Sequence, residues 1–339
     1  MSAFFEIIHW VFPHSLPAGV DSPKKRLLPV LLIPCFIFLN LSLLRAETDR
    51  SLLPAEFGEV IYRCQETSPK QLFIIGMAHR DALTGLSIPA VSRAQAEVYK
   101  LGEWLIQNER CELLLPEGFF ARPAAGAGKD RRREPGEKVA CPESIDIKTL
   151  EEKLSDNRSF VNAEMLLKRN YDLRLRQVED PKMHGAVGEL IRKLVRCGQD
   201  HAGYLRIKSD LDLLQERRTA VMIQRIPEII EAEFREGKIR APKAIFTIGL
   251  SHLPRIIRYL EEEKVRVPSP PAAGDKAPSE LKLKRENFGV SVLIPRALAG
   301  DRKILKNAGL DEILERQGLL SSSRVSSQSG NGSAATRLP

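Results

Sequence analysis

Four short stretches of the chain consist almost wholly of apolar residues, and each predicts a strand. They are residues 72–76, 111–116, 244–249 and 288–294. Nearly continuous apolar runs are typical of strands that are buried on both faces of a parallel sheet. We therefore expect an α/β fold in which helices flank a central, mostly parallel sheet.

Helix-forming segments lie between the second and third of these strands. They are centred near residues 147–168 and 185–198, followed by a longer helix from about 209 to 226. We expect Pro227 to end that helix, because proline lacks the backbone N–H that the helix needs. The pattern predicts one α/β domain over residues 50–318, with these helices as an insertion.

Three polar side chains follow the predicted strands closely. His79 and His252 each come three residues after a strand-terminal glycine, at Gly76 and Gly249, and Glu117 follows the strand over residues 111–116. Ligands of open α/β sheets bind at the carboxyl ends of the strands. The pattern therefore indicates a crevice that contains two imidazoles and a carboxylate.

Arg218 interrupts the apolar face of the longer helix. At 100° per residue it lies on the same arc as Leu214, Val221 and Met222. A buried arginine needs an ionic partner, because an unpaired buried charge is very costly. The alternative is a surface side chain that extends its charged end into water.

The N-terminal region has the pattern of an export signal. Three cations at residues 24–26 precede an uncharged stretch over residues 27–44, and Ala46 follows. This arrangement predicts a signal peptide or an uncleaved signal anchor within residues 1–46, and hence export to the periplasm or cell envelope. The Ser/Gly-rich residues 319–339 predict a disordered tail.

Charge and cysteine content refine these expectations. The net charge is +8, but the basic residues are scattered, so we expect no nucleic-acid partner. In an oxidising compartment the cysteines beyond the signal could form disulfides, with a pairing that the sequence leaves open. The alternative interpretation of Cys111 is a small residue of the hydrophobic core. The cysteines concerned are Cys64, Cys111, Cys141 and Cys197.

The candidate residues suit two kinds of chemistry. His79, His252 and Glu117 form a donor set for a divalent transition metal such as zinc, which can polarise a carbonyl and activate water. Arg218 can then hold a substrate carboxylate or stabilise an oxyanion. Without a metal, Glu117 and one histidine can act as general base and acid. The structural alternative is that these side chains merely satisfy hydrogen bonds at the strand ends.

The order of these motifs resembles the TraB/PrgY–GumN–Tiki superfamily. The matching positions are Gly76–His79, Glu117-Gly118, Arg218–Met222 and Gly249–His252. The family usually shows Glu-Arg-Asn/Asp-x-x-Met. Anchoring on Met222 selects Arg218, with Thr219 in place of Asn/Asp, whereas anchoring on Glu-Arg selects Arg217.

The resemblance implies a fold related to erythromycin esterases and haem-binding lipoproteins. It implies a site built from the two histidines, the glutamate and the arginine. Tiki members are metal-dependent, membrane-associated proteases, which implies manganese or cobalt as the metal. Other members block peptide pheromones or have no assigned activity.

The leading hypothesis is an exported, metal-dependent hydrolase that acts on a peptide or a small ester, with Mn, Co or Zn as cofactor. The alternative is a non-catalytic envelope module that binds or sequesters a peptide or haem. A third hypothesis is a structural protein in which the histidines form hydrogen bonds within the core.

Overall fold

The computed structural model describes residues 53–78, 89–120, 143–156, 161–198, 200–267, 279–283 and 288–318. His79, the predicted export signal and the predicted C-terminal tail lie outside these residues. In the part of the chain that is described, no helix is both long and apolar enough to cross a membrane.

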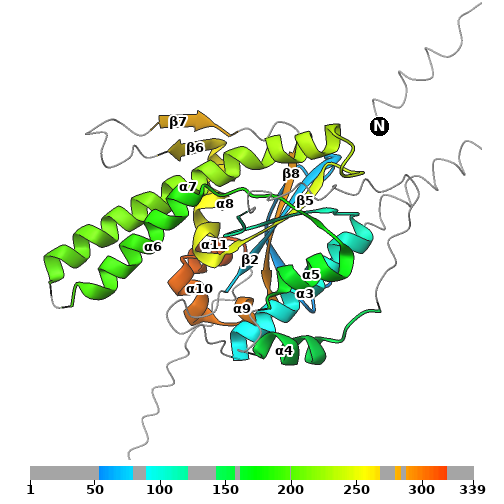
Figure 1. The fold of residues 1–339 in the computed structure, drawn as a ribbon, viewed down its shortest axis with the longest axis horizontal. Helices are drawn as coiled ribbons and strands as arrows, with labels where there is room; N and C mark the ends of the chain where they lie inside the picture. The colour runs from blue at the N-terminus through cyan, green and yellow to red at the C-terminus, as the bar shows by residue number, and fades with distance from the viewer. Residues whose placement is uncertain are drawn as a thin grey trace, which may run out of the picture. The chain divides into compact units, whose positions relative to one another are not determined.

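The fold is α/β, as predicted, and its centre is a six-stranded mixed sheet (Figure 1). The strand order is β1-β8-β2-β5-β3-β4, and all neighbours are parallel except β1 and β8. A separate antiparallel pair joins β6 to β7. The strands are β1 (Gly58–Cys64), β2 (Lys70–Met77), β3 (Leu113–Pro116), β4 (Arg174–Leu175), β5 (Lys243–Gly249), β6 (Lys264–Val267), β7 (Ser279–Lys282) and β8 (Phe288–Pro295).

Helices cover both faces of the sheet. Side chains alternate along β2, so Phe73 and Ile75 pack against one helical layer while Leu72 and Ile74 pack against the other. The first layer contains α3 (Pro89–Asn108), α4 (Ile147–Ser155) and α5 (Ala163–Tyr171). The second contains part of α7 (His201–Arg235), α8 (Leu253–Glu262), α10 (Arg302–Ala308) and α11 (Asp311–Arg316). The remaining helices are α6 (Pro181–Arg196), the short 3-10 helix η2 (Leu250–His252) and α9 (Arg296–Ala299).

The parallel register brings three strand ends together. Met77 at the end of β2 pairs with Gly249 at the end of β5, and Pro116 at the end of β3 pairs with Thr247. Gly76 allows β2 to approach the segment after β5, because an added Cβ there would lie 2.5 Å from Leu253 Cδ1. The carboxyl ends of β2, β5 and β3 therefore form one continuous edge.

Several boundaries differ from those predicted. Helix α7 does not end at Pro227 but continues to Arg235, because isoleucines on both sides of the proline pack against the sheet. The order of strand, helix and strand over residues 72–116 predicts a βαβ unit with adjacent strands. Strand β5 instead lies between β2 and β3, so these two strands are not neighbours in the sheet. The alternating apolar and polar residues 173–178 predict a strand, but β4 spans only two of them.

Cys111 is confirmed as a core residue. It is fully buried and carries a free thiol, and burial raises the pKa of that thiol far above its usual range. Cys197 is also a free thiol. Neither therefore forms one of the disulfides that an oxidising compartment would allow, and Cys141 lies outside the described residues.

Candidate active site

Glu117 occupies the first position after β3 and is bonded to the end of β5. Its backbone N–H donates to the Thr247 carbonyl at 2.9 Å, which extends the parallel ladder by one residue. Its carboxylate Oε2 accepts the Gly249 backbone N–H at 2.6 Å. Two bonds to the neighbouring strand thus fix the carboxylate at the carboxyl edge of the sheet, where the sequence placed it.

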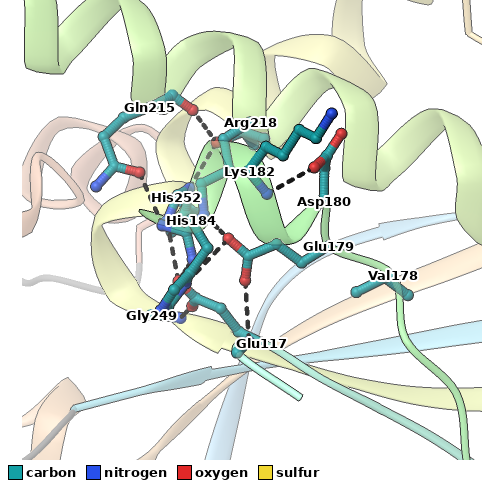
Figure 2. A network of polar contacts seen from close by, with 12 residues as sticks. Glu117, Val178, Glu179, Asp180, Lys182, His184, Gln215, Arg218, Gly249 and His252 are labelled. Atoms are coloured by element: carbon teal, nitrogen blue, oxygen red, sulfur yellow. Dashed lines mark hydrogen bonds and ion pairs between the residues drawn. The ribbon is translucent and has the colours of Figure 1, made fainter. Parts of the chain in front are cut away.

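Arg218 reaches this edge from α7 and is 4% exposed. Its Nη2 donates to Glu117 Oε1 at 2.5 Å, and its Nε donates to Glu179 Oε1 (Figure 2). Burial alone would lower the pKa of Arg218, but the hydrogen bonds and charges of Glu179 and Glu117 outweigh it and raise the pKa above its usual value. The prediction that a buried Arg218 needs an ionic partner is confirmed.

Glu179 is the partner that the sequence analysis missed. It lies between β4 and α6, and its side chain is fully buried. Its Oε2 accepts the backbone N–H of Gly118 at 3.0 Å. Gly118 has a φ of +74°, a conformation that favours glycine. One sequence feature could have identified Glu179: it is an acidic residue directly before Asp180-Pro181, where a helix starts.

His252 ends η2, beside Glu117 and Arg218, and is 2% exposed. Its Nδ1 lies 2.5 Å from the Thr219 hydroxyl, which donates its single proton to the Gln215 carbonyl at 2.8 Å. His252 Nδ1 must therefore be the donor to Thr219. In the neutral imidazole Nε2 is then the acceptor, and it lies 3.5 Å from Arg218 Nη1 and 3.4 Å from Glu117 Oε1.

His184, on the first turn of α6, forms the exposed side of the cluster. The side chain is 48% exposed, and its Nδ1 lies 3.3 Å from Glu179 Oε1. The ring packs edge-on against Phe120, with 5.0 Å between the ring centroids. His184 lies outside the strand-end pattern of the sequence, and its position relative to the strand ends depends on how α6 folds back.

The structure therefore brings together three of the four predicted site residues, namely Glu117, Arg218 and His252. His79 lies outside the described residues. Thr219 and Gln215 also belong to the cluster, and both come from the turns of α7 that surround Arg218. Glu179 and His184 come from the segment that leads into α6.

The predicted metal site stays a prediction. Glu117 Oε1 and His252 Nε2 are two acceptors that face each other across 3.4 Å. Two ligands of one zinc, with bonds near 2 Å, lie roughly 3.3 Å apart, which matches this separation. The Arg218 guanidinium, however, already donates to Glu117 Oε1 at 2.5 Å and lies 3.5 Å from His252 Nε2. Among the described residues, which exclude His79, no group of three or more metal-ligating side chains is close enough to hold one.

No family model, curated protein or solved structure matches this chain. The resemblance to the TraB/PrgY–GumN–Tiki superfamily therefore rests on the sequence motifs alone.

Proposed function

We propose that this protein is an exported, metal-dependent hydrolase that cleaves a peptide or ester bond at the carboxyl edge of its sheet. The observation that carries the proposal is the convergence of Glu117, Arg218 and His252, which come from three distant segments, on a single buried cluster. Several polar groups in one buried site are costly to assemble, and such arrangements are concentrated at functional sites.

Glu117, His252 and His79 would hold the metal in this proposal. When bound there, a divalent ion supplies a Lewis acid and lowers the pKa of a water molecule. The His252 tautomer suits this role, since Nε2 is an acceptor while Nδ1–H is held by Thr219. Metal-ligating histidines commonly use one nitrogen for the ion and the other for an orienting bond of this kind.

The other side chains have separate roles in the proposal. Arg218 is kept charged by its two carboxylates, so it can stabilise negative charge that develops on a substrate oxygen. Glu179 lies 3.3 Å from Nδ1 of His184 and orients this half-exposed ring at the edge of the cluster. His184 would therefore contact a substrate that approaches the buried cluster from solvent.

One observation favours the alternative, a non-catalytic envelope module that binds or sequesters a peptide or haem. His252 and Arg218 are almost completely buried, and their polar atoms contact one another or their neighbours within the cluster. A cluster of this kind can stabilise the edge of a binding site without taking part in a reaction.

The test uses the full chain, treated with a chelator and then resupplied with Mn²⁺, Co²⁺ or Zn²⁺, in peptidase and esterase assays. We expect metal-restored turnover, and a loss of about 100-fold or more in H252A, E117Q and H79A. The matched control is H201A, which removes an exposed histidine at the start of α7. Turnover that H252A and H79A leave intact would refute the assignment. Stoichiometric ligand binding without turnover, retained in E117Q, would select the alternative.

A further inference from the structure

Helix α6 and the first half of α7 form a hairpin that extends away from the sheet (Figure 1). Of the α6 residues, all of which the structure describes, Val187 alone is buried. From His201 to Arg217, a stretch that is described throughout, Gly203 is the one buried residue. The far end of this hairpin therefore receives little support from the rest of the domain.

The end of the hairpin, which we call the tip and define as residues 192–198 and 200–208, combines exposed apolar side chains with positive charge. Val195, Tyr204 and Leu205 are 60%, 39% and 51% exposed. The same stretch contains five basic residues and one acidic residue. The basic residues, all exposed, are Arg192, Lys193, Arg196, Arg206 and Lys208.

With one acidic residue against five basic ones, the tip keeps an excess of four positive charges. Asp200 caps the N-terminus of α7, where its Oδ1 accepts the Gly203 N–H at 3.0 Å. A carboxylate at this position interacts with the positive end of the helix dipole. Of the five cations, Arg192 pairs with Glu189 at 2.5 Å. The tip therefore presents a net positive surface with apolar residues between the charges.

We propose that the tip docks onto a membrane surface that contains anionic phospholipids. Basic residues are attracted to the negative headgroups, and exposed Tyr, Leu and Val side chains enter the boundary between headgroups and acyl chains. The same charges disfavour a tip-to-tip contact with a second copy of the chain, because two net positive surfaces would meet. The inference does not depend on the proposed hydrolase activity.

The experiment measures amide hydrogen exchange of the full chain with two kinds of vesicle. One kind contains phosphatidylcholine alone, and the other contains phosphatidylcholine and phosphatidylglycerol in roughly equal amounts. We expect exchange in the tip to slow by about tenfold with the anionic vesicles only, and the protection to fall as salt is added. This readout is local to the tip, so binding through the predicted N-terminal apolar segment does not imitate it.

Variants separate the two contributions. The charge reversal K193E/R196E/R206E should abolish the protection, and Y204S/L205S should reduce it. The matched control is L213S, which replaces a side chain that is 47% exposed but lies beyond the tip. Equal protection by both kinds of vesicle, or protection that survives the charge reversal, would overturn the proposal. Protection that rises with protein concentration in the absence of vesicles would instead identify a second copy as the occupant.

Discussion

The two halves of α7 belong to one continuous helix but have opposite environments. Before Arg218 the residues of the helix are exposed or partly exposed, except for buried Gly203, whereas from Arg218 onward the helix packs against the sheet. The change takes place within one turn, and the candidate site lies at that turn. The buried half of the helix therefore fixes Arg218 in place, while the accessible half carries a separate surface.

The sequence explains where the change occurs. In the second half, Met222, Ile226 and Ile230 follow Arg218 at intervals of four residues, and all three are buried. This spacing places them on one side of an α-helix. In the first half, exposed Leu205 and Leu213 are eight residues apart, with no apolar neighbour on the sheet to cover them. The buried stripe is therefore continuous in only one half.

The largest expected effect on stability comes from removing the charge of Arg218, which marks the boundary between the exposed and the buried half of α7. R218M should lower the free energy of unfolding by about 4 kcal/mol, because Glu117 and Glu179 would lose a buried ionic partner. Denaturant unfolding measures the change. R217M, one position earlier, is the matched control and should cost less than about 1 kcal/mol. Equal losses in the two variants would show that the boundary is not at Arg218.

A smaller effect should follow from a cavity in the packed half. I226A removes a side chain with no exposed surface and should cost about 3 kcal/mol. L213A, in the accessible half, should change the stability by no more than about 0.5 kcal/mol. The pair compares the two halves directly in thermal or denaturant unfolding. A large loss in L213A would mean that the first half is packed in solution.

The smallest expected effect concerns the bond that orients His252. T219V keeps the shape of the side chain but removes the oxygen that accepts from His252 Nδ1, so the free energy of unfolding should fall by about 1–2 kcal/mol. NMR of the imidazole nitrogens should also show a loss of the Nδ1–H tautomer. An unchanged tautomer would mean that Thr219 does not set it.

Much of the sheet was predictable because its signal is local. The apolar runs that became β2, β3, β5 and β8 are strong enough to be recognised without knowledge of their neighbours. Arg218 was also predictable, since a charge on an apolar helical face requires a partner whatever the fold. These features depend on residues that are close together in the chain.

The missed features depend on distant segments. Glu179 lies between the alternating residues 173–178 and α6, and its role is set by Arg218, which is 39 residues away. The position of β5 between β2 and β3 has no local signature either. The prediction that Pro227 ends the helix was wrong, because tertiary packing of Ile223, Ile226 and Ile230 outweighs the local cost of proline within α7.

The residues of the candidate site are far apart along the chain, and this separation affects when the site can form during folding. Arg218 and Glu117 are 101 positions apart, and Gly249 and Glu117 are 132 apart, whereas α6 and α7 follow each other directly. Closing long loops costs more entropy than joining neighbours, so contacts of high sequence separation form late. During synthesis the α6–α7 hairpin can form before β5 exists. The basic tip of the hairpin can therefore form before the buried site is assembled.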